Sequence, residues 1–395
     1  MALPLIYNYR HLLAHKTTSV MTVGVIAAVV GLFSWLLSFS SALDASLAVA
    51  ADENKIIVLK QGATSESNSA IAVEDYHRLD QLTGVARDEK TDRALISPEM
   101  MVQAYLPRVR DGGKTFCNVA VRGVTDMAFK VHRNVRIVEG RRFGTGSPEV
   151  IVGVQASKQF GGLGIGQSVS LGSGNDRAFT VTGYFSAAGG PMESEIWAYL
   201  SPLMNASHRE MYSSVFLRVK EGVDPQEVIK RIMGPAIQLK AQTEASYWRL
   251  QSMGIRGYLL VASLLAAVMG LAAVLSIANT MYAMVAGRTQ EVAMLRTIGY
   301  PKRAILMSFL MESALLSLTG GIIGCLGCMI WLATIGNTKD MFGFFTFTTL
   351  AFEIGLTPKA ALIALVSVTL VGMCGSVFPA WRAARIPVVS ALREP

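Results

Sequence analysis

Residue patterns that could support nucleotide chemistry occur at two places in the sequence, and both are incomplete. Gly113, Lys114 and Thr115 resemble the end of a phosphate-binding loop, but the first glycine of that motif would have to stand at Arg108. The run 161–166, GGLGIG, resembles a dinucleotide loop but lacks the strand before it and the helix after it, so its glycines are interpreted as turn residues. We therefore expect no catalytic residue in this chain and no ATP hydrolysis by the chain itself.

Side chains that could bind a metal or exchange electrons are scattered. His77, His132 and His208 lack the spacing of metal ligands, so we expect each of them at the surface. Cys325 and Cys328 have CxxC spacing, but they lie in a glycine-rich apolar run, where packing is the favoured interpretation over a metal or redox site. The sequence thus predicts no metal site and no cofactor bound by this chain.

One ionisable residue lies where charge is expensive. Glu312 is about two helical turns into a long apolar run, and a carboxylate there is costly unless it is paired or solvated. We expect an intramembrane ion pair with Arg296, Lys302 or Arg382. A proton relay is the alternative, and it is disfavoured because no second carboxylate or histidine occurs in any apolar run.

The segment 286–304, AGRTQEVAMLRTIGYPKRA, has the composition of a short helix with both of its ends marked. Glu291 near its start and Arg296 near its end match the helix dipole. Gly287 separates it from the preceding run, Gly299 supplies a left-handed stop, and Pro301 prevents continuation.

This short helix also has an apolar stripe, formed by Val292, Leu295 and Ile298 at three-residue spacing. Such a helix can lie along a membrane surface and present one face to something in the cytoplasm. The alternative is a basic connecting loop that only sets topology. The residues alone leave both interpretations open.

The elements that would position these residues are membrane helices. The chain has 395 residues, of which 51% are hydrophobic and only 16% charged, which indicates membrane spans with a substantial soluble part. The net charge of +8 comes largely from residues that flank apolar runs, so we expect contact with membrane lipid and not with nucleic acid. Four transmembrane helices are predicted, at 18–43, 255–285, 305–335 and 360–380.

The third of these runs carries glycines at helical spacing. Gly320, Gly324 and Gly327 are expected to let this helix approach another backbone closely, and Gly320 with Gly324 forms a GxxxG pair. In a membrane, such glycines usually serve helix packing.

The remaining ranges complete the predicted domain organisation. Residues 1–17 resemble an interfacial helix on the inner leaflet, and we favour an uncleaved first span over a signal peptide. Residues 44–254 are predicted to form a large α/β domain with a stalk, either as one body or as two subdomains, and its last part is expected to be helical from about Gln238. A short outer loop at 336–359 and a cytoplasmic tail at 381–395 follow.

The distribution of Lys and Arg predicts the orientation of the chain. These residues are concentrated in the N-terminal segment, in 286–304 and in the tail, whereas 336–359 has few of them. The positive-inside rule then puts both termini and 286–304 in the cytoplasm and the α/β domain outside, in a bacterial cytoplasmic (inner) membrane.

Two motifs together resemble the FtsX/MacB-like permease family of ABC transporters, whose members act by mechanotransmission. The first is GRTQEVAMLRTIGYPKRAILMSFLMESALLSLTGGIIG, through Glu291, Leu295, Arg296, Gly299, Glu312, Gly320 and Gly324. The second, VFPAWRAARIPVVSALRE, is similar to the family's C-terminal pattern through Pro379, Arg382, Pro387 and Arg393. The outer phrases EGRRFGTGSPEVIVG and GLGIGQSVSLG are similar to those of the family's periplasmic core domain.

The resemblance implies an assembly. It implies a pair of permease subunits, most simply a homodimer, a cytoplasmic ABC ATPase that binds ATP and Mg, and in some members a periplasmic membrane-fusion adaptor. The coupling helix would be 288–298. Its contacts with the ATPase would involve Arg288, Glu291, Val292, Leu295, Arg296 and Gly299. Because the chain contains no ATP-binding cassette, we expect the ATPase on a separate polypeptide.

The function that the resemblance implies is the coupling of ATP hydrolysis to movement of the periplasmic domain, which drives export or extrusion of a substrate. The alternative is a non-transporting FtsX-like regulator that activates an extracellular cell-wall hydrolase or another partner. A sensory receptor is disfavoured because no signalling domain is present in the sequence. Nothing in the sequence indicates the transported substrate.

Overall fold

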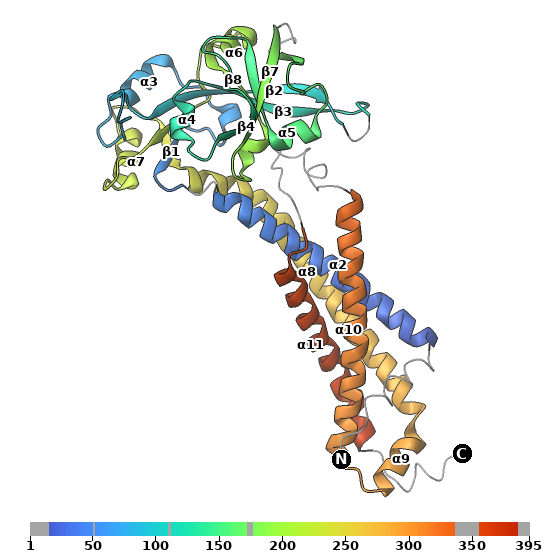
Figure 1. Cartoon of the computed structure of the whole chain (residues 1–395). Helices are drawn as coiled ribbons and strands as arrows, with labels where there is room; N and C mark the ends of the chain where they lie inside the picture. The colour runs from blue at the N-terminus through green and yellow to red at the C-terminus, as the bar shows by residue number, and fades with distance from the viewer. Residues whose placement is uncertain (1–15, 50–51, 110–111, 172–176, 336–354, 386–395) are drawn as a thin grey trace. The chain divides into compact units, whose positions relative to one another are not determined.

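The computed structural model describes residues 16–49, 52–109, 112–171, 177–335 and 355–385 (Figure 1). It contains two compact units: a helical unit drawn from residues up to 41 and from 255 onward, and a sheet unit drawn from 42–254. The interfacial helix predicted within 1–17 and most of the outer loop predicted at 336–359 lie outside the described residues.

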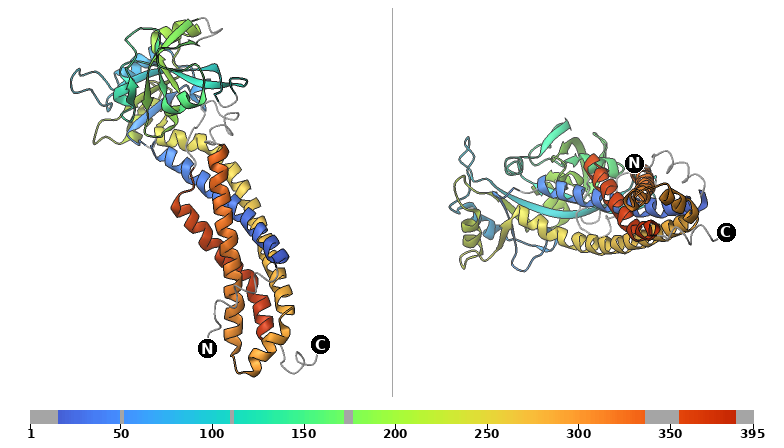
Figure 2. Two further views of the ribbon diagram at one scale, coloured as in Figure 1. Left: turned by 45° about the vertical axis from the view of Figure 1, so that its right-hand side comes forward. Right: turned by 90° about the horizontal axis from the view of Figure 1, so that it is seen from below.

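Four long helices make up the helical unit, and each is long and apolar enough to cross a membrane. They are α2 (Lys16–Val49), α8 (Glu244–Ala286), α10 (Lys302–Ile335) and α11 (Pro358–Ala384). The short helix α9 (Thr289–Thr297) connects the end of α8 to the start of α10 (Figure 2). The four predicted spans are therefore present as helices, and α2 and α8 each continue without a break into the sheet unit.

Small and hydroxyl side chains bring these helices together. The hydroxyls of Ser313 in α10 and Ser376 in α11 lie 2.6 Å apart, and those of Thr22 in α2 and Thr280 in α8 are also separated by 2.6 Å. A Cβ on Gly372 of α11 would collide with the side chain of Ser317 in α10. Hydroxyl pairs and glycines are the usual means of close packing between membrane helices, because lipid tails remove the hydrophobic driving force.

The sheet unit is a ten-stranded sheet in the order β10-β1-β9-β2-β3-β8-β5-β7-β4, with β6 paired to β7. Its strands are β1 (Lys55–Leu59), β2 (Ile96–Pro107), β3 (Phe116–Val124), β4 (Arg136–Gly140), β5 (Glu149–Gly153), β6 (Ser168–Leu171), β7 (Arg177–Ser186), β8 (Ile196–Tyr199), β9 (Ser214–Arg218) and β10 (Lys240–Thr243). Its helices are η1 (Glu66–Asn68), α3 (Val73–Asp80), α4 (Ala128–Val131), α5 (Val154–Gln159), η2 (Pro191–Ser194), α6 (Leu200–Ser207) and α7 (Pro225–Met233).

The long strand β2 unites what we expected as two subdomains. Its first four residues, 96–99, pair antiparallel with β9, and the rest of the strand pairs antiparallel with β3. One strand thus belongs to both halves of the sheet. This strand was not predicted from the sequence, because Pro98 and Glu99 interrupt its apolar pattern.

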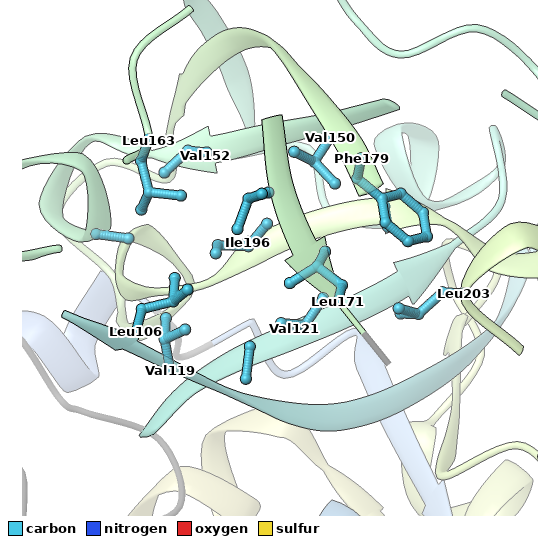
Figure 3. Packing of buried hydrophobic residues seen from close by; sticks show 14 of the residues in the cluster. Leu106, Val119, Val121, Val150, Val152, Leu163, Leu171, Phe179, Ile196 and Leu203 are labelled. Atoms are coloured by element: carbon cyan, nitrogen blue, oxygen red, sulfur yellow. The ribbon is translucent and has the colours of Figure 1, made fainter. Parts of the chain in front are cut away.

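The core of the sheet unit consists of three apolar clusters on its faces. Strands β1 and β9 are buried at every position, which explains why their sequences are nearly continuous apolar runs. Figure 3 shows the cluster formed by side chains of β2, β3, β5, β8 and neighbouring elements. Its labelled members are Leu106, Val119, Val121, Val150, Val152, Leu163, Leu171, Phe179, Ile196 and Leu203.

The prediction of a helix from about Gln238 is wrong at its start. Residues 240–243 form the edge strand β10, which pairs antiparallel with β1, and α8 begins only at Glu244. The sequence KAQT has no strand pattern of its own, so the pairing with β1 decides its conformation.

Candidate functional site

The helix α9 begins and ends at the signals present in its sequence. Arg288 is its N-cap, Glu291 lies in its first turn and Arg296 in its last. At its end, Gly299 has a φ of +100°, and the amides of Gly299 and Tyr300 donate to the carbonyls of Arg296 and Leu295 at 3.2 and 3.1 Å. This is a Schellman motif, so the predicted left-handed stop at Gly299 is confirmed.

The two faces of α9 differ in their surroundings. Val292 and Ala293 are buried, and Val292 belongs to an apolar cluster with Met284 of α8 and Ala383 of α11. On the outward face the exposed residues are Gln290, Glu291, Met294, Thr297 and Ile298, with Met294 58% and Ile298 70% exposed. The helix is thus anchored on one side and offers an apolar and acidic surface on the other.

The predicted apolar stripe is only partly correct. Val292 is buried and Leu295 half-buried, but Ile298 faces outward. The reason is geometric: at about 100° per residue, two steps of three residues fall about 120° short of two full turns, so Ile298 leaves the buried face.

Glu312 forms an ion pair, but with a residue that we had not considered as its partner. Its Oε2 accepts a hydrogen bond from Nη1 of Arg288 at 3.2 Å, and both side chains are buried. We had expected Arg296, Lys302 or Arg382 in this position, and Arg288 was not among the candidates. Arg288 is buried beside this carboxylate of α10, and its predicted contact with the ATPase stays a prediction.

The glycines of α10 differ in their roles. A Cβ on Gly320 would lie 2.7 Å from Cγ2 of Ile26 in α2, and one on Gly324 would lie 2.5 Å from the carbonyl oxygen of Ala27. Gly327, expected to take part in the same packing, has open space where its side chain would be. The close approach of α10 to α2 therefore depends on the GxxxG pair.

The C-terminal motif lies at the end of α11. Pro379 is buried inside the helix, next to Ala380 and near Ala383 in the cluster that includes Val292, so this end of α11 supports α9. Arg382 is exposed. Pro387 and Arg393 lie outside the described residues.

The sheet unit contains a buried charged group that sequence reasoning missed. Arg122 of β3 is fully buried and donates to Glu66 at 2.7 and 3.0 Å, to Glu99 at 2.7 Å and to Glu195 at 2.7 and 2.9 Å. We call these four residues the Arg122 centre. Ser214 and Trp197 complete it by donating to Glu66 and Glu195 at 2.6 and 3.0 Å.

His132 extends the Arg122 centre, and its expected position at the surface is wrong. The imidazole is fully buried, with Nε2 2.7 Å from Oε1 of Glu99 and Nδ1 3.1 Å from Nζ of Lys55. The ring also packs edge-on against Phe216. No spacing rule would have revealed this, because the residues come together only through strand pairing. His77 and His208 are exposed as expected.

The carboxylates of this group have pKa values displaced in opposite directions. Burial raises the pKa of Glu99, but its contacts with His132 and with the Arg122 guanidinium outweigh burial and lower the pKa from 4.5 to about 2. For Glu195, burial outweighs Arg122, and the nearby Glu66 adds to it, so its pKa is raised. Burial acts against the Arg122 cation, yet its carboxylates raise its pKa well above the ordinary value.

The other motifs weighed for chemistry form turns or packing contacts. Gly113, Lys114 and Thr115 lie in the turn between β2 and β3, and the run 161–166 is a turn in which Gly162 and Gly166 have positive φ. Cys325 and Cys328 are buried free thiols. Among the described residues, no group of three or more His, Cys, Asp or Glu side chains has the geometry to hold a metal ion.

Two family models match the chain. The MacB-like periplasmic core domain matches residues 17–234, which is more than half of the chain, and the FtsX-like permease C-terminal domain matches residues 263–388. Together they cover every strand except β10, together with α9, α10 and most of the other long helices, and residues 235–262 lie between the two matches.

Curated relatives include two macrolide export ATP-binding/permease proteins named MacB. The one from Bordetella avium is 25% identical over 76% of this chain and 46% of its own length, and the one from Pasteurella multocida is 25% identical over 70% and 43%. The chain thus spans less than half the length of these relatives. The solved periplasmic region of MacB from Actinobacillus actinomycetemcomitans is 14% identical, covering 51% of this chain and 93% of its own, with a TM-score of 0.36.

The four apolar helices and the match to a periplasmic core domain make this a multi-pass membrane protein with a large extracytoplasmic domain. The chain belongs to the FtsX/MacB-like permease family of ABC transporters.

Proposed function

We propose that this chain is a permease subunit that couples ATP hydrolysis by a cytoplasmic ABC ATPase to movement of its extracytoplasmic domain, and so drives export of a substrate. The observation that carries the proposal is the asymmetry of α9. One face is anchored among the spans through Val292, and the other exposes Glu291, Met294 and Ile298. An anchored helix with an exposed apolar face is suited to receive a push from a docked partner.

Three features explain how such a push would be transmitted. The ion pair between Arg288 and Glu312 ties the start of α9 to α10, so that displacement of α9 moves the spans with it. Cross-helix contacts such as those of Gly324 and Ser313 join α10 to α2 and α11. Both α2 and α8 continue as helices into the extracytoplasmic domain. In this mechanism the spans act as levers.

The proposed assembly follows from the same reasoning. The ATPase, with its ATP and Mg, belongs to a separate polypeptide, and a second permease subunit, most simply a copy of this chain, completes the pair of levers. A periplasmic adaptor is a further partner. The relatives are macrolide exporters by name, which favours export as the direction. With this orientation, both termini and α9 are cytoplasmic.

The experiment introduces a charge on the exposed face of α9, where the ATPase is proposed to dock. Met294→Glu puts a carboxylate on an apolar surface without disturbing the buried side of α9. We expect the rate of ATP hydrolysis that co-purifies with the tagged chain from its native membranes to fall about tenfold or more, as when a central interface residue is lost.

The matched control is Met211→Glu, because Met211 is also exposed, at 53%, but lies in the extracytoplasmic domain. The control should retain the hydrolysis rate of the wild type. Equal rates for Met294→Glu and the wild type, or wild-type protein without any associated ATPase, would contradict the proposal.

A further inference from the structure

The first turn of α8 is tied to the sheet by a buried ion pair. Glu244, the first residue of α8, lies with its Oε2 2.6 Å from Nζ of Lys55 in β1, and both side chains are buried. Nearby, Tyr247 and Trp248 of α8 belong to an apolar cluster of the same domain, and Gln251 donates to the carbonyl of Thr64 at 3.0 Å. The charged contact therefore adds to an apolar one.

Lys55 also connects this ion pair to the Arg122 centre. A lysine ammonium only donates hydrogen bonds, so Nδ1 of His132 must accept from Lys55. The ring proton then lies on Nε2 and is donated to Glu99, which in turn accepts from Arg122. A continuous line of hydrogen bonds and ion pairs thus runs from α8 through β1, α4 and β2 to β3.

The Arg122 centre extends these contacts to further elements of the sheet unit. Arg122 binds Glu195, which precedes β8, and Glu66 of η1 through two hydrogen bonds each. Multiple charge-assisted bonds to one planar guanidinium fix orientation more firmly than apolar contacts, which have no preferred direction. A displacement of Glu244 would therefore also displace Lys55 and His132, which contact the Arg122 centre in the middle of the sheet.

We propose that Lys55, His132 and Glu244 are positioning residues that fasten the start of α8 to the Arg122 centre, so that movement of α8 is delivered to the middle of the extracytoplasmic sheet. The source of that movement rests on the proposed function. The attachment itself does not, and it is tested without any ATPase.

The competing explanation is that Tyr247 and Trp248 hold α8 by apolar packing and the charges only satisfy one another. The two explanations differ in what removal of the Lys55–Glu244 pair does. Removal of one partner strands a buried charge and weakens the whole domain, whereas replacement of both by apolar residues can leave stability nearly unchanged. The double variant Lys55→Met/Glu244→Leu therefore isolates positioning from stability.

The measurement is amide hydrogen exchange of the full-length protein in lipid nanodiscs. In the double variant we expect exchange in 248–254 to become about tenfold faster, while the strands β2 and β3 keep their protection and the thermal midpoint stays close to that of the wild type. The matched control is Arg141→Met/Glu149→Leu, which removes an ion pair of the same domain that does not involve α8. Unchanged exchange in 248–254 of the double variant would overturn the proposal.

Two conservative variants keep the test decisive if the double variant fails to fold. Glu244→Gln keeps the shape but removes the charge, and it should accelerate exchange in 248–254 by a larger factor than in the strands β2 and β3. Glu244→Asp keeps the charge within reach of the flexible Lys55, and it should restore protection. Equal exchange in the two variants would show that the charge does not position α8. The exchange experiment contains no ATPase, so equal exchange in these two variants would contradict only the attachment of α8. An unchanged hydrolysis rate in Met294→Glu would contradict only the proposed function.

Discussion

At the scale of single residues, the pair Arg288–Glu312 and the Arg122 centre are both buried charges, and they differ in how the charges are compensated. Glu312 pairs with Arg288 at 3.2 Å, whereas Arg122 binds three carboxylates with five hydrogen bonds of 3.0 Å or less. The sequence could reveal the first, because a carboxylate in an apolar run is conspicuous. It could not reveal the second, because Glu99 and Arg122 are single charges in two separate strands, and only the pairing of strands brings them together and buries them.

The lowered pKa of Glu99 leads to a prediction about acid stability. A folded-state pKa of about 2, below the ordinary 4.5, means that ionised Glu99 contributes stability in full above pH 4.5. That contribution is lost as the pH falls through about 2. Glu195, whose pKa is raised, contributes with the opposite sign, because burial of its charge is unfavourable.

The measurement compares the wild type with Glu99→Gln in the full-length protein at a series of pH values. Above pH 4.5 the variant should be less stable by about 3–5 kcal/mol, the usual effect of breaking a buried pair, and the difference should shrink toward pH 2. Glu227→Gln, at an exposed ion pair with Arg231, serves as the control and should change stability by less than about 1 kcal/mol. A difference that is independent of pH would contradict the assignment.

At the scale of elements, local signals predicted helix ends better than helix faces. The Schellman motif at Gly299 follows from one glycine and the proline after it, so the end of α9 was predictable. The outward position of Ile298 was missed, because three-residue spacing drifts away from a single face by about 60° at each step. Likewise β10 owes its conformation to a partner strand that lies far away in the sequence.

The packing of α10 on α2 leads to a prediction with an internal control. Gly324→Ala would put a Cβ 2.5 Å from the carbonyl oxygen of Ala27 and 3.0 Å from Cβ of Val30, and the helices would have to separate. We expect a loss of stability of about 1–3 kcal/mol, measured as a lower thermal midpoint in nanodiscs.

Gly327→Ala is the comparison, since nothing lies within 4 Å of its added methyl group. It should leave the midpoint unchanged or raise it slightly, because alanine has the higher helix propensity. If both variants lowered the midpoint equally, loss of glycine as such, and not the approach of α2, would be responsible.

At the scale of the whole molecule, composition and apolar runs were sufficient to predict four spanning helices and a large α/β domain between the first and the second of them in the sequence, which the structure and the family matches confirm. They were not sufficient to predict that one strand would join both halves of the sheet. That outcome depends on β2, which pairs with β9 at one end and with β3 along the rest. Strand order is set by contacts distant in sequence, which composition does not encode.

The proposed orientation predicts opposite labelling of two positions. In a Cys374→Ser background, which removes the exposed native thiol, Met211→Cys should react with a membrane-impermeant maleimide on intact spheroplasts. Thr297→Cys in α9 should react only after permeabilisation. Inside-out vesicles should show the reverse, with Thr297→Cys labelled and Met211→Cys protected. Labelling of Thr297→Cys on intact spheroplasts, or unchanged labelling in inside-out vesicles, would contradict the orientation.

The ion pair between Arg288 and Glu312 also bears on how the protein is made. The two residues are 24 positions apart, and Arg288 is synthesised first. A lone carboxylate enters hydrocarbon at a high cost, so α10 reaches its final depth only when the preceding arginine has folded back onto it. We therefore expect membrane insertion of the third span to be coupled to folding of the turn before it.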